Sequence, residues 1–202
     1  MKPQIRSEYN GKGYVYAASA ADIARDTGFE KIARLASNEN PFEPAPEIQK
    51  AAALALSDIN RYPDPSSAKL RAAIRKHIYD APVVVSGSGM DGVIETVIRV
   101  IVSPGDTVAV AAPTFSVYGL AAKAASANIV NIPSREDFTI DIDLFIEKAR
   151  TAKLSFLCTP NNPTGTTVPA AEVKRILENI EGFLFLDCAY IEFADEDYYS
   201  LL

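Results

Sequence analysis

Short apolar segments of strand length alternate with segments of helical period between residues 83 and 187. The apolar segments are 83–86, 107–112, 128–132, 154–158 and 183–187, and the helical segments between them are 90–101, 115–127, 141–150 and 169–179. Uninterrupted apolar runs are typical of strands buried on both faces, and helical connections between strands are typical of parallel sheets. The sequence therefore predicts an α/β fold: a mostly parallel, five-stranded sheet with helices on both faces.

The first third of the chain is patterned differently. Residues 1–34 show no sustained period apart from a short helical stretch near 20–27, and we interpret them as an N-terminal arm and a contribution to a smaller domain. Two further helices are predicted at 46–57 and 66–79. We therefore divide the chain into the arm and a sheet-bearing domain at 35–202.

The composition argues against several classes of partner and site. A formal net charge of −6 disfavours nucleic acid and anionic membranes. No apolar run approaches the ~20 residues of a membrane span, and the first residues lack the apolar core of a secretory signal, so we expect a cytoplasmic protein. Cys158 and Cys188 are expected to be free thiols, and the single His77 argues against a histidine-rich metal site and a Ser-His-Asp triad.

A glycine-rich turn follows the first predicted strand and opens a helix. Its residues 86–92 formally match the G-x-G-x-x-G pattern of dinucleotide sites at Gly87, Gly89 and Gly92. That interpretation requires an acidic residue at the end of the next strand, which instead ends in Ala-Ala-Pro. A glycine turn at a helix N-terminus also offers backbone N–H groups to a phosphate, and a turn without a ligand is the alternative.

Two adjacent asparagines follow the strand at 154–158. The sequence Thr-Pro-Asn-Asn-Pro-Thr-Gly at 159–165 predicts a turn. One asparagine is enough to make it, so the second amide is available to a ligand at the carboxyl end of a strand, where open α/β sheets bind their ligands.

An acidic residue, Asp187, ends the last predicted strand after four apolar residues, and Tyr190 follows closely. Burying a carboxylate costs several kcal/mol unless it is paired or hydrogen-bonded, so a ligand partner and a helix cap are the two interpretations. Together with the aromatic Phe115, these strand ends offer a phosphate cup, a ring, an amide, a carboxylate and a phenol. That set suits pyridoxal phosphate, a phosphorylated ring with a basic nitrogen and a hydroxyl.

Six short motifs also resemble a known family. They are ASNENPF (36–42), RYPDP (61–65), GMDGVIE (89–95), PTFSVY (113–118), TPNNPTG (159–165) and LDCAYIEF (186–193). In order and spacing they resemble the class I/II aminotransferases of fold type I, most closely the histidinol-phosphate branch. The resemblance implies the large domain of a fold type I enzyme, incomplete at its C-terminus, with pyridoxal phosphate as cofactor.

The resemblance also implies how the phosphate is bound. Backbone N–H groups of Gly89, Met90 and Asp91 would hold the cofactor phosphate. Tyr62 would reach the phosphate of the neighbouring subunit's cofactor, which implies a homodimer with shared sites.

For the cofactor ring, the resemblance implies four side chains. Phe115 would stack on the pyridine ring, and Asp187 would pair with its nitrogen. Asn162 would bond the ring oxygen, with Tyr190 beside it. Asp187 and Tyr190 are accordingly the expected catalytic residues.

The sequence departs from the family at the lysine that forms the Schiff base. In the family this lysine lies in a Ser-x-x-Lys-like segment that follows the motif with the Asp and the Tyr. No lysine follows Lys174 in this sequence. The one Ser-x-x-Lys match, Ser66–Lys69, lies on an early predicted helix. The family's downstream arginines are also missing. We expect the N-terminal part of a longer aminotransferase, and the alternative is a complete protein that has lost transamination. The 202-residue chain alone is predicted to be inactive.

The implied reaction is amino transfer between histidinol phosphate and 2-oxoglutarate, in histidine biosynthesis. The alternatives are a related decarboxylase, an aromatic aminotransferase, and a non-catalytic cofactor-binding or dimerisation fragment.

Overall fold

The structure, a computed structural model, describes residues 4, 6–9, 17–33, 35–81 and 83–201. The chain divides into two compact units. One comprises Met1–Tyr14 with Leu70–Leu202, and the other is Val15–Lys69. Each unit is described by itself below.

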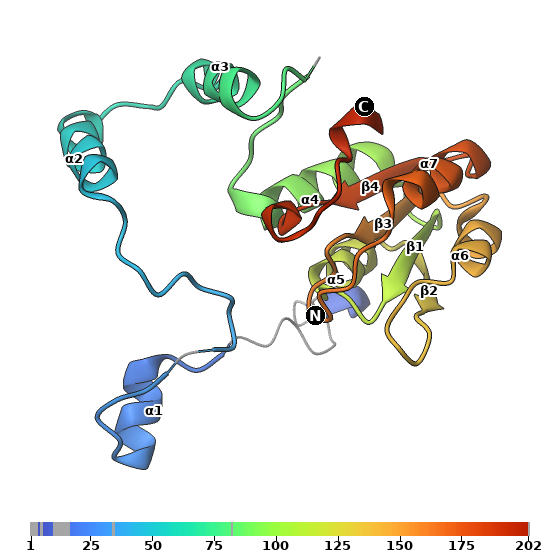
Figure 1. The fold of residues 1–202 in the computed structure, drawn as a ribbon, viewed down its shortest axis with the longest axis horizontal. Coiled ribbons are helices and arrows are strands. Elements are labelled where there is room, and N and C mark those ends of the chain that lie inside the picture. Colours follow the sequence, from blue (N-terminus) through green and yellow to red (C-terminus); the bar gives the residue numbers. More distant parts are fainter. Residues whose placement is uncertain (1–3, 5, 10–16, 34, 82, 202) are drawn as a thin grey trace. The chain divides into compact units, whose positions relative to one another are not determined.

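A parallel sheet of four strands forms the centre of the larger unit. Its strands are β1 (Thr107–Ala112), β2 (Asn128–Pro133), β3 (Leu154–Cys158) and β4 (Phe183–Asp187). Their order is β2-β1-β3-β4, and every pair is parallel (Figure 1). After β1, the chain places β2 on one side of it and then β3 on the other side. The sheet therefore has a topological switch point between β1 and β3.

Helices cover both faces of this sheet, as predicted. They are α4 (Gly89–Ile101), α5 (Val117–Ala124), α6 (Ile142–Ala149) and α7 (Ala170–Asn179). The side chains of β1 alternate between two cores: Val108 and Val110 pack with α4 and α5, whereas Ala109 and Ala111 pack with α6 and α7. This two-sided burial explains why the strands are continuously apolar.

The predicted first strand at 83–86 was wrong. This segment is irregular backbone, and the sheet has four strands among the described residues. Val84 is buried, but Val83 and Val85 are 69% and 68% exposed. Three consecutive valines favour extended backbone, but a strand also needs a pairing neighbour, and no described strand pairs with this segment.

The Val15–Lys69 unit contains the predicted early helices. They are α1 (Ala20–Thr27), α2 (Pro46–Ala55) with the 3₁₀ turn η2 (Leu56–Asp58), and α3 (Ala68–His77), which continues into the larger unit. The remaining 3₁₀ turns are η1 (Ser7–Tyr9), η3 (Ile191–Phe193) and η4 (Tyr199–Leu201). None of the helices in the described part of the chain combines the length and the apolar character that a membrane span requires.

Candidate active site

The segments after β1 and β3 are joined at the switch point of the sheet, where α/β proteins bind their ligands. Thr114 Oγ1 donates a 2.7 Å hydrogen bond to Asn161 Oδ1, and Asn161 Nδ2 donates to the Pro113 carbonyl oxygen at 3.0 Å. Asn161 is only 8% exposed. These bonds fix the loop after β3 against the loop after β1.

The two adjacent asparagines have different surroundings. Asn161 makes the turn: its N–H donates to the Thr166 carbonyl oxygen at 2.8 Å, and its own carbonyl oxygen accepts from the Gly165 N–H at 2.7 Å. Asn162 is half-buried, and its side-chain amide forms no hydrogen bond with any residue that the structure describes. Asn162 therefore has the free amide that a ligand requires, although its role stays a prediction.

Asp187 ends β4 beside Cys158 of β3 and is 3% exposed. Tyr118 Oη donates to Asp187 Oδ2 at 2.6 Å, and the Ala189 N–H donates to Oδ1 at 3.0 Å. Within the described ranges no lysine or arginine forms an ion pair with this carboxylate. Asp187 is thus a buried acid with hydrogen-bond donors but no cation, which suits a cationic ring nitrogen.

The helix-cap interpretation of Asp187 was wrong. The next helical element, η3, has Tyr190 at its N-cap, without a side-chain capping bond. Asp187 instead accepts from the backbone two residues on, in an Asx turn. This turn carries the chain from β4 to Tyr190, which is half-buried.

Tyr118 was missed by the sequence reasoning. It lies on α5, is fully buried, and stacks on Phe156 with ring centroids 4.6 Å apart. The rings of Phe115 and Tyr118 form a T-shaped contact, with their centroids 5.6 Å apart. Burial and the hydrogen bond to Asp187 raise the pKa of Tyr118 well above its ordinary value, so its hydroxyl stays a donor. The three-residue spacing from Phe115, one helical turn, is the sequence signal that could have revealed it.

The N-terminus of α4 is open to an anion. Gly89 has φ of +67°, which favours glycine, and Ser88 makes no capping bond to the first turn. The first N–H groups of a helix lack intrahelical partners, so those around Met90 and Asp91 suit a phosphate. Both residues are exposed.

The two cysteines are free thiols, as predicted. Cys158 Sγ donates to the Pro160 carbonyl oxygen at 3.3 Å, and burial raises its pKa. Burial, aided by the nearby Asp187, raises the pKa of Cys188 to about 12. A raised pKa disfavours the thiolate, which is the nucleophilic form of cysteine. His77 is exposed, and no cluster suited to a metal occurs among the residues described.

Tyr62 lies in the Val15–Lys69 unit, and its side chain is fully exposed. Phe115 and Asn162 follow the ends of β1 and β3, and Asp187 is the last residue of β4; these three strands are neighbours in the sheet. The structure therefore gathers the residues predicted for the cofactor ring at one edge.

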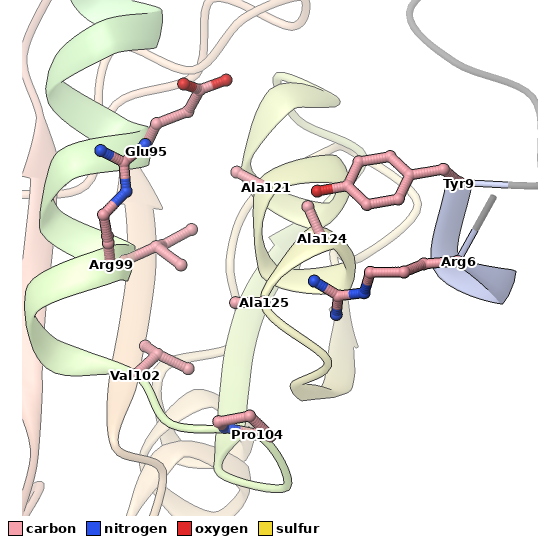
Figure 2. A pocket seen from close by; sticks show the side chains of 10 residues that line it. Arg6, Tyr9, Glu95, Arg99, Val102, Pro104, Ala121, Ala124 and Ala125 are labelled. Atoms are coloured by element: carbon pink, nitrogen blue, oxygen red, sulfur yellow. The ribbon is translucent and has the colours of Figure 1, made fainter.

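A separate cavity of about 470 Å³ lies between η1, α4 and α5 (Figure 2). Arg6 and Tyr9 line it on one side, and Glu95 and Arg99 line it on the other. Arg6 Nη2 donates to Ser126 Oγ at 2.8 Å. The cavity shares no residue with the predicted site.

Comparison with known proteins assigns the class. The family model for aminotransferase class I and II matches residues 30–202, and the chain belongs to this family. The predicted resemblance and fold class are thereby confirmed.

Individual relatives narrow the comparison. The chain is 58% identical over 202 residues to histidinol-phosphate aminotransferase of Methanocorpusculum labreanum, covering all of the chain and 58% of the relative. It is 53% identical to that of Methanoculleus marisnigri, covering all of the chain and 57% of the relative. A crystal structure of histidinol-phosphate aminotransferase from Sinorhizobium meliloti with pyridoxal-5'-phosphate matches with a TM-score of 0.82 at 25% identity, covering 96% of the chain and 53% of that structure. The chain thus spans somewhat more than half the length of these relatives.

Proposed function

We propose that this chain is part of a pyridoxal-phosphate-dependent aminotransferase that transfers an amino group from histidinol phosphate to 2-oxoglutarate in histidine biosynthesis. The observation that carries the proposal is the buried Asp187 carboxylate, held by two donors and by no cation among the described residues. The identities of 58% and 53% to histidinol-phosphate aminotransferases support this substrate over an aromatic amino acid and amino transfer over decarboxylation.

The residues at the sheet edge fit the cofactor. Bound there, pyridoxal phosphate supplies a protonated pyridine ring that withdraws electrons from the substrate's reacting carbon. Asp187 keeps the proton on the ring nitrogen, because a buried anion favours a neighbouring positive charge. Asn162 donates to the ring oxygen, and Tyr190 lies beside it. Phe115, half-buried after β1, presents its ring to the pyridine and excludes water from that side.

The phosphate is held at the opening of α4. The N–H groups of Gly89, Met90 and Asp91 donate to its oxygens, and the positive end of the helix dipole adds to the attraction. We propose that Tyr62 of one protomer reaches the phosphate bound by the other, so that the sites form in a homodimer. The exposed side chain of Tyr62 supports this role. Sedimentation at the mass of a single protomer would contradict it.

Among the residues that the structure describes, neither of the two lysines considered in the sequence forms a hydrogen bond or ion pair with Asp187 or Asn162. Lys69 is exposed on α3, and Lys174 is exposed on α7, where its Nζ lies 4.0 Å from Glu178 Oε1. We therefore propose that the 202-residue chain alone does not catalyse amino transfer.

Borohydride reduction tests the assignment as an enzyme against the non-catalytic alternative. We expect reduction of the protein as its cell makes it, loaded with pyridoxal phosphate, to fix a pyridoxyl group on one lysine. Peptide mass mapping would locate that lysine outside Met1–Leu202. A loaded protein with no fixed pyridoxyl group would favour the non-catalytic cofactor-binding alternative, and a label on Lys69 or Lys174 would show that a lysine of this chain serves the reaction.

A further inference from the structure

The Asp187 carboxylate is held from two directions. Its Oδ2 accepts from the Tyr118 hydroxyl on α5 at 2.6 Å, and its Oδ1 accepts from the Ala189 N–H of its own loop at 3.0 Å. Rotation of the carboxylate would break both bonds. The Tyr118 bond is the one that connects Asp187 to a separate element of the fold.

Tyr118 itself is fixed by its aromatic neighbours. Its ring lies nearly parallel to that of Phe156, at an interplanar angle of 11°, and the edge contact with Phe115 is at 83°. Close packing against both rings in a fully buried position restrains the Tyr118 side chain. The hydroxyl is therefore preorganised toward Asp187.

We propose that Tyr118 is a positioning residue for the cofactor, whose hydroxyl holds the Asp187 carboxylate as a fixed acceptor for the ring nitrogen. This inference rests on the proposed function. The Tyr118 hydroxyl donates a hydrogen bond to Oδ2 and so stabilises the carboxylate anion. The proton that lies between Asp187 and the ring nitrogen therefore stays on the nitrogen. Phe115, Tyr118 and Asp187 then form one continuous set of contacts, from the residue proposed to face the ring to the partner of its nitrogen.

The test is Tyr118→Phe in the protein as its cell makes it, loaded with pyridoxal phosphate labelled with ¹⁵N in the ring. The substitution retains the stack on Phe156 and removes only the hydroxyl. We expect the ring ¹⁵N resonance to move toward the value of an unprotonated pyridine, and the affinity for the cofactor to fall about tenfold, the effect of losing one hydrogen bond to a charged group.

Tyr198→Phe is the matched control. Its buried hydroxyl lies 2.8 Å from Thr159 Oγ1 and 2.6 Å from the Val168 carbonyl oxygen, with no hydrogen bond to Asp187. We expect this variant to lose stability while the ring resonance stays in place. An unmoved resonance in Tyr118→Phe, or equal movement in both variants, would overturn the positioning role. If the unsubstituted protein itself bound no cofactor, or bound it with an unprotonated nitrogen, the proposed function would fail, and the role of Tyr118 with it.

Discussion

Replacing Asp187 with alanine is expected to lower the rate of amino transfer by about two to three orders of magnitude, the range seen when a preorganised electrostatic partner of a transition state is removed. Without the carboxylate, nothing at the end of β4 holds a proton on the ring nitrogen, and the ring loses most of its ability to withdraw electrons. The measurement is the turnover rate of the cofactor-saturated protein.

Asp187→Asn separates this electrostatic effect from a packing effect. The amide has nearly the same shape and its oxygen can still accept from Tyr118, with its NH2 group facing the Ala189 N–H, but it carries no charge. We expect it to be nearly as slow as the alanine variant, whereas Asp195→Ala, at an exposed acid eight residues further on, should retain full activity. Wild-type turnover in Asp187→Asn would show that the carboxylate is not the partner of the nitrogen.

Replacing Gly182 with alanine is expected to reduce the free energy of unfolding by about 3 kcal/mol, the upper part of the range for overpacking. Gly182 directly precedes β4, where the chain passes close to the segment that leads into β3. A Cβ atom here would overlap the Ala152 carbonyl oxygen and lie 2.7 Å from that of Lys153. Both neighbours are backbone, so the strand itself must shift. Urea unfolding, followed by circular dichroism, measures the change.

Gly119→Ala is the matched control for this prediction. Gly119 lies within α5, and a Cβ atom there would meet nothing within 4 Å. Because alanine is the better helix former, we expect this variant to gain about 0.5–1 kcal/mol. Equal stability of Gly182→Ala and the unsubstituted protein would contradict the close packing at the start of β4.

The regular part of the fold followed from local pattern. The strands from 107 onward were predicted because short, continuous apolar runs are typical of strands buried on both faces of a sheet. The segment 83–86 has the same local character, but no strand in the described part of the chain pairs with it. Pairing is a property of the assembled sheet, so residue type alone did not reveal its absence.

The sequence predicted those features of the site that depend on neighbouring residues in the chain. The different surroundings of Asn161 and Asn162 follow from turn chemistry, which needs one amide and leaves the other free. The bond between Tyr118 and Asp187 joins residues 69 positions apart. It depends on how α5, which packs on β1 and β2, places the Tyr118 side chain against Phe156 of β3, and no short motif encodes that arrangement.

The most direct test of the account is an amino transfer assay on the protein as its cell makes it, saturated with pyridoxal phosphate. With histidinol phosphate as donor and 2-oxoglutarate as acceptor, we expect stoichiometric formation of glutamate, with phenylalanine and tyrosine as much poorer donors. Absence of glutamate, release of carbon dioxide, or faster turnover of an aromatic amino acid would contradict the proposed reaction.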